Sequence, residues 1–179
     1  MTASPPEFSR IVRLDEIARL EWPATITADD AERAAIASRF SFASLNQLEA
    51  EYSIEREGKD IVATGRVRAA LTQPCIATGE PVAETISEEF LIRFIPETEQ
   101  QSGADDEEIE LDAEECDILT YSGNRINIGE AIAETLALAV NPYPRSEGAE
   151  VYLREAGVLT EEQAGPFAAL AALKGKTGQ

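Results

Sequence analysis

Residues 49–96 carry the pattern that most constrains how this chain can fold. Apolar side chains occupy alternate positions in three stretches, 49–57, 61–71 and 82–95, and turns that contain glycine separate them. A period of two directs alternate side chains to opposite faces of a β-strand, so one face can contact a core while the other meets water. Strands joined by short turns pair in antiparallel fashion. The pattern therefore predicts an antiparallel meander.

A helix is predicted directly after Asn127. Asn127 can cap it, and Glu130 stands three residues later, where a capping-box carboxylate reaches back to the cap's own N–H. Apolar or small side chains then recur at helical spacing: Ile128, Ala131, Ile132, Thr135, Leu136 and Ala139. This stripe predicts a helix docked on the core. Pro142 and Pro144 cannot continue a helix, so we expect the chain to leave it in a stiff, extended form.

Three further segments complete the expected architecture. Residues 8–14 predict a strand with both faces partly apolar, and residues 118–121 predict a short strand before the helix. Residues 27–40 predict a helix that Thr27 or Asp29 can cap. Together these elements predict an α+β protein, with an antiparallel sheet, open or barrel-like, packed with a few helices.

An acidic segment interrupts the pattern between the last long strand and the helix. Residues 97–117 hold eleven acidic residues, and neither Lys nor Arg occurs between Arg93 and Arg125. Such a run predicts a solvated loop inserted in the domain. Its carboxylates lack the spaced ligands and the glycine of a calcium-binding loop, so we expect no metal there.

The chain is expected to form a single α+β domain with a tail at each end. Residues 1–7 predict a flexible tail, residues 8–147 the domain, and residues 148–179 an extension with a short helix near its end. Phe167 and Leu170 are the candidate docking residues of that helix. They can dock on the protein's own domain or on a partner, and the sequence leaves both open.

The net charge of −19 bears most directly on the kind of partner. Nucleic-acid affinity is built largely from Lys and Arg that replace counterions, so an acidic surface disfavours phosphate backbones and favours a basic protein. Arg66, Arg68 and Arg93 on the predicted strands form a candidate basic strip, which keeps direct RNA contact open as the less favoured alternative. Solubility alone is the other explanation of the acidity.

The residues that usually carry catalysis are scarce. Histidine is absent, which excludes Ser-His-Asp and Cys-His activation of a nucleophile. Two isolated cysteines, Cys75 and Cys116, cannot complete a four-ligand zinc site without carboxylates, so we expect free thiols, no metal and no cofactor. Glu88 and Glu89 are adjacent on a predicted strand and point to opposite faces, which argues against a catalytic pair. We therefore expect a protein that is not an enzyme.

The sequence also bears on location. No apolar run approaches the about 20 residues of a membrane-spanning helix. The opening residues, MTASPPEFSR, lack the basic and apolar regions of a signal peptide. We expect a cytoplasmic protein with no membrane segment.

Several motifs follow one another in a characteristic order. They are residues 65–70 with Gln73-Pro74-Cys75, then Glu80-Pro81-Val82, residues 89–94, the acidic segment, residues 126–138 with Asn141-Pro142-Tyr143-Pro144-Arg145, and residues 166–174. This order resembles the YceD family of large-ribosomal-RNA-subunit accumulation proteins, and the last motif is similar to the tail of its alphaproteobacterial branch. The helix with its Pro-Tyr-Pro-Arg exit is the most specific part of the resemblance.

The resemblance implies a non-enzymatic ribosome-biogenesis factor that supports accumulation or processing of large-subunit (23S) ribosomal RNA. Because the chain is acidic, we expect its immediate partner to be a basic ribosomal or ribosome-assembly protein. The alternative is a general acidic adaptor or chaperone-like binder of basic proteins, unrelated to ribosomal RNA. Many relatives carry a second cysteine close after the first, whereas this chain has residues 76–79 without one, so no metal or redox role carries over to Cys75.

The helix exit is the candidate partner contact. It comprises Asn141, Pro142, Tyr143, Pro144 and Arg145. A stiff, extended backbone would present Tyr143 and Arg145 to a partner. The alternative is that Tyr143 packs on the domain and Arg145 only solvates it.

Overall fold

The computed structural model describes residues 7–97 and 117–158. The chain divides into two compact units, one built from 1–73 and 83–142 and the other from 74–82 and 143–179. The domain predicted over 8–147 therefore contributes residues to both units.

The first unit is built on a five-stranded sheet with the order β2-β3-β4-β5-β6. The strands are β2 (Ala24–Thr27), β3 (Ser44–Glu57), β4 (Asp60–Pro74), β5 (Pro81–Pro96) and β6 (Asp117–Tyr121). The predicted meander is β3-β4-β5, and Gly58 makes its first turn with φ of 65°. The sheet is open, with β2 and β6 at its edges, so the α+β class is confirmed without barrel-like closure.

Strand β6 departs from the expected antiparallel pattern. It pairs with β5 in parallel, from Ile92 opposite Asp117 to Pro96 opposite Tyr121. A parallel neighbour needs a connection of a dozen or more residues to bring the chain back to the same end of the strand. Residues 97–116 supply that length, and no short turn does.

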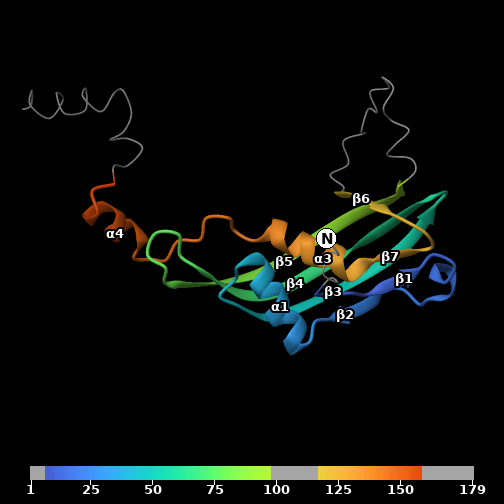
Figure 1. Cartoon of the computed structure of the whole chain (residues 1–179), viewed down its shortest axis with the longest axis horizontal. Coiled ribbons are helices and arrows are strands. Elements are labelled where there is room, and N and C mark those ends of the chain that lie inside the picture. Colours follow the sequence, from blue (N-terminus) through green and yellow to red (C-terminus); the bar gives the residue numbers. More distant parts are fainter. Residues whose placement is uncertain (1–6, 98–116, 159–179) are drawn as a thin grey trace, which may run out of the picture. The chain divides into compact units, whose positions relative to one another are not determined.

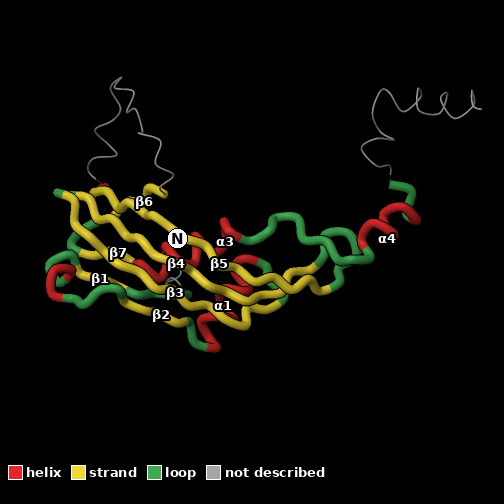
Figure 2. The backbone as a smooth tube through the Cα atoms, turned by 180° about the vertical axis from the view of Figure 1, so that it is seen from behind, coloured by secondary structure: helices red, strands yellow, loops and turns green. Residues whose placement is uncertain are grey.

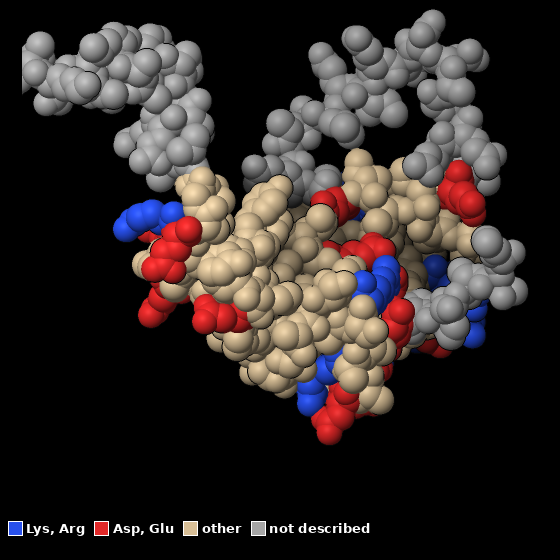
Figure 3. All heavy atoms as spheres, turned by 60° about the vertical axis from the view of Figure 1, so that its left-hand side comes forward, with Lys and Arg blue, Asp and Glu red and all other residues tan. Residues whose placement is uncertain are grey.

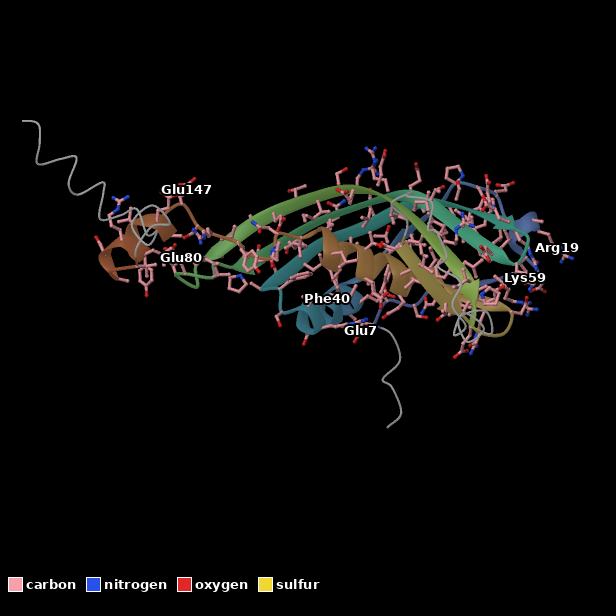
Figure 4. All side chains as sticks on the ribbon, turned by 90° about the horizontal axis from the view of Figure 1, so that it is seen from above. Glu7, Arg19, Phe40, Lys59, Glu80 and Glu147 are labelled. Carbon is pink, nitrogen blue, oxygen red and sulfur yellow. The ribbon has the colours of Figure 1, made fainter. Side chains whose placement is uncertain are left out.

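Helices α1 (Asp30–Phe40) and α3 (Ile128–Ala139) cover one face of this sheet, as Figures 1 and 4 show. Figure 2 shows the strands from the other side, with both helices behind them. The predicted stripe of α3 is confirmed, because Ile128, Ile132 and Leu136 are fully buried in the core. Their burial against the sheet is what holds α3 in place, since a helix of this length is marginal alone.

The helix caps match the sequence in part. Asp29, rather than Thr27, caps α1, and Asn127 caps α3 by accepting a hydrogen bond from the Glu130 N–H at 3.4 Å. The predicted capping box at Glu130 is wrong. Its carboxylate instead accepts a 2.7 Å bond from Arg39 of α1, because a guanidinium gives a charge-assisted bond that is stronger than one from a neutral N–H.

Strand β1 (Ile11–Arg13) pairs antiparallel with β7 (Arg125–Asn127) in a separate two-stranded sheet. A short 3-10 helix, η1 (Ile17–Arg19), follows β1. Val12 is buried but Ile11 is 52% exposed, so the strand has one buried face and not two apolar faces in the core. This pairing brings the N-terminal part of the described chain against the start of α3.

Candidate functional site

The exit from α3 is held to the sheet by three polar residues of the first unit. Gln73 of β4 donates from Nε2 to the Asn141 carbonyl at 2.9 Å and to Glu84 Oε2 of β5 at 2.9 Å. The Asn141 N–H donates to Glu84 Oε1 at 3.0 Å. Each of the three residues is hydrogen-bonded to the other two, so this network holds the chain at Asn141 against the sheet.

The rest of the candidate partner contact belongs to the second unit. Pro144 is buried and its carbonyl accepts a 2.9 Å bond from the Ile76 N–H, whereas Tyr143 is 70% exposed and Arg145 is exposed. The two residues that flank the buried Pro144 are thus both exposed. Whether they contact a partner stays a prediction.

Cys75 is a buried residue of the second unit. Its thiol is 3% exposed and free, and its sulfur accepts bonds from the N–H groups of Thr78 at 3.4 Å and Ser146 at 3.3 Å. These donors, Thr78 first, lower the pKa of Cys75 to about 6, since they stabilise the thiolate. The sulfur therefore ties the turn at 75–80 to the segment before helix α4 (Ala149–Glu155). A thiolate covered in this way is shielded from reagents in solution, so its evident role is to hold the unit together.

The arginines of the candidate basic strip are all paired with carboxylates. Arg66 bonds to Glu89, Arg68 lies 3.5 Å from Glu49, and Arg93 lies 2.9 Å from Glu57 and 3.2 Å from Asp60. Arg66 and Arg68 line one shallow depression on the uncovered face of the sheet, and Arg93 lies outside it. The three arginines are thus spread over the sheet with their charges compensated. On the face that Figure 3 shows, basic and acidic side chains are also mixed.

Two further features bear on function within the described residues. No group of three or more Cys, Asp or Glu side chains there is arranged to hold a metal ion. No helix in the same part of the chain has the length and apolar character needed to cross a bilayer. Cys116 and the candidate docking residues Phe167 and Leu170 lie outside the described residues.

A scan against protein-family models matches residues 63–174 to the family described as large ribosomal RNA subunit accumulation protein YceD. The chain belongs to this family. The YceD match starts within β4 and contains Gln73, Cys75, α3 and the helix exit, together with all three arginines of the candidate basic strip. Comparison with curated proteins and with solved structures found no match.

Three residues of the YceD-matched segment that make long-range hydrogen bonds, Gln73, Glu84 and Ser146, were not identified from the sequence as site residues. Gln73 and Glu84 each bond to Asn141, which lies 68 and 57 positions away. Ser146 bonds to Cys75 across 71 positions. Only a polar residue within an otherwise apolar strand face, such as Glu84, signals such a contact in advance.

Proposed function

We propose that this protein is a non-enzymatic factor that supports accumulation or processing of large-subunit ribosomal RNA, and that it acts in the cytoplasm through contacts with a basic protein. The observation that carries this proposal is membership of the YceD family, whose name describes large-subunit ribosomal RNA accumulation. The partner that fits best is a basic ribosomal or ribosome-assembly protein.

Charge supports a protein partner over bare RNA. The chain carries 34 acidic and 15 basic residues, and the candidate basic strip is compensated by neighbouring carboxylates. RNA would have to break these ion pairs and approach a protein surface that is negatively charged like itself. A basic protein can bind without breaking the pairs, and the negative surface attracts it at long range. Direct RNA contact is the less favoured alternative.

A non-enzymatic role is supported by the side chains available. The sequence has no histidine, and the one described cysteine is buried beneath its hydrogen-bond donors. Under this proposal the protein acts by binding a partner through its surface.

Deleting the gene is expected to lower the ratio of large- to small-subunit ribosomal RNA, because the proposed factor acts on the large subunit alone. The measurement is electrophoresis of total RNA, quantified for both species, and expression of the intact chain from a plasmid is the control that restores the ratio. An unchanged ratio in the deletion strain would contradict the proposal.

A pull-down with the full chain as bait separates the partner classes. We expect a basic ribosomal or assembly protein to remain bound after nuclease treatment and to be released as salt is raised, since salt screens exposed charge. Loss of the captured protein on nuclease treatment would mean that RNA carries the contact. Capture of many unrelated basic proteins to the same extent would favour the general adaptor instead.

A further inference from the structure

The second unit buries few of its apolar side chains. Among its described residues, only Cys75, Pro144 and Ala149 are buried, and none of them is a large apolar residue. Nine large apolar side chains of the described chain are exposed, and five of them belong to this unit: Ile76, Tyr143, Val151, Tyr152 and Val158. A small unit that buries so little is marginal on its own, so its apolar surface needs a cover.

Helix α4 carries the most ordered part of this surface. Its apolar stripe has the helical spacing i, i+3, i+4 and i+7, with Ala149, Tyr152, Leu153 and Ala156. Ala149 in the first turn is 1% exposed, but Leu153 is only half-buried and Tyr152 is 52% exposed. The Val158 N–H bonds to the Leu153 carbonyl at 2.9 Å, which places this exposed valine beside the last turn. Beyond the first turn, the described residues therefore cover the stripe only in part.

The chain supplies an apolar segment shortly after α4. Residues 166–173 read PFAALAAL, without a single polar side chain, and Pro166 suits the first position of the helix that the sequence predicts there. The YceD match ends at Lys174, directly after this segment, so the segment belongs to the matched region. The connection, 159–165, can span up to about 25 Å, whereas α4 is only about 10 Å long. The segment can therefore turn back and lie along α4.

Charge favours the same pairing. The described residues of the second unit carry four carboxylates and two guanidinium groups: Glu80, Glu147, Glu150, Glu155, Arg145 and Arg154. None of these four carboxylates forms an ion pair with another described residue. Residues 166–179 carry Lys174 and Lys176 and no acidic residue. The segment therefore approaches a surface of opposite charge.

The tether selects this segment over a partner or a second copy. A short connection holds a segment at an effective concentration in the millimolar range, without any new contact. A partner or a second copy would have to exceed that concentration, or bind more tightly, to take the same place.

We propose that residues 166–173 pack on the apolar stripe of α4 and complete the second unit. Phe167 and Leu170, spaced as on one side of a helix, contact Tyr152 and Leu153. Such a pair of helices joined by a short loop is a common way to bury two apolar stripes against each other. This inference does not rest on the proposed function. It assigns the candidate docking residues to the protein's own fold, so a partner has to be bound by another surface.

The test compares the full chain with the double variant Phe167→Ser with Leu170→Ser by amide hydrogen exchange. We expect the amides of α4 to exchange at least about tenfold faster in the variant, because a helix of seven residues without packing is marginal. Glu161→Ser with Gln163→Ser is the matched control, because it alters the same extension outside the apolar segment. The control should leave the exchange rates of α4 unchanged. The unfolding midpoint followed at Trp22 should stay the same in both variants, because Trp22 belongs to the first unit.

A second measurement detects the contact itself. In the unaltered full chain we expect nuclear Overhauser contacts between the ring of Tyr152 and the methyl groups of Leu170, since packed side chains approach within about 4.5 Å. A mixture of isotope-labelled and unlabelled chains, recorded with isotope filtering, shows whether the two residues belong to the same molecule.

Four results would overturn the proposal. Equal exchange rates of α4 in the unaltered chain and in Phe167→Ser with Leu170→Ser would show that the segment does not cover the helix. Faster exchange confined to the first unit would show that the segment packs there. Absence of the contact between Tyr152 and Leu170 would exclude the proposed packing. A contact found only between labelled and unlabelled chains would show that a second copy supplies the segment.

Discussion

Gly65→Ala is expected to lower the free energy of unfolding by about 3 kcal/mol, at the upper end of what overpacking costs. A Cβ at Gly65 would lie 2.2 Å from the Glu51 carbonyl oxygen, 2.8 Å from the Tyr52 Cα and 2.9 Å from the Phe90 ring. Two of these obstacles are backbone atoms of the paired strand β3, so the strands themselves must separate. For a chain of this size the melting temperature should fall by roughly 6–12 °C.

The fluorescence of Trp22 reports this loss within the first unit. It is the only tryptophan, and its ring lies 5.7 Å from that of Tyr52, which pairs with Gly65. Gly148→Ala is the matched control, because its Cβ would meet only Glu80 Oε2 at 3.9 Å. A midpoint for Gly65→Ala equal to that of Gly148→Ala would contradict the close approach of the strands.

Glu32→Ala is expected to cost about 2 kcal/mol near neutral pH, since one carboxylate makes two kinds of contact. It accepts bonds from both terminal nitrogens of Arg10, at 2.6 and 2.9 Å, and from the Asp29 N–H at 2.9 Å in the capping box of α1. Glu32→Gln keeps the capping geometry without the charge, so about half of the cost should remain. Urea unfolding followed at Trp22 measures both variants.

The same pair predicts how stability depends on pH. Hydrogen bonds from Arg10 hold the pKa of Glu32 below its ordinary value of 4.5. A carboxyl whose pKa is lower in the folded state contributes stability above the unfolded value and loses it as pH falls through the folded value. The difference in free energy of unfolding between the unaltered protein and Glu32→Gln should therefore be largest near neutral pH. It should disappear well below about pH 4. A gap that stays constant into acid would show that charge plays no part.

Local patterns in the sequence predicted the elements well. The stripe of α3 and its Asn127 cap depend on residues within a few positions of one another, so periodicity alone reveals them. The turn at Gly58 likewise follows from one glycine between two alternating stretches. These features were predictable because their causes lie close together in the chain.

Pairings between residues that lie far apart in the sequence could not be predicted. The arginines of the candidate basic strip look like an open row of charge in the sequence, but the strand register places Glu51 opposite Arg66 and Glu49 opposite Arg68. The register depends on which faces meet the core, which no single strand reveals.

The β1–β7 pair makes the order of synthesis a constraint on folding. The backbone N–H of Arg10 bonds to the Asn127 side chain, 117 positions later, and Leu14 bonds to the Asn124 carbonyl. The ribosome therefore makes β1 long before its partner exists, and Phe8 and Val12, both buried in the finished core, must wait for β7. The meander can form early, because its contacts lie within one stretch of the chain. The β1–β7 pair forms late, because closing the long loop between the two strands costs conformational entropy. This protein, proposed to assist ribosome production, is thus unfinished for most of its own translation.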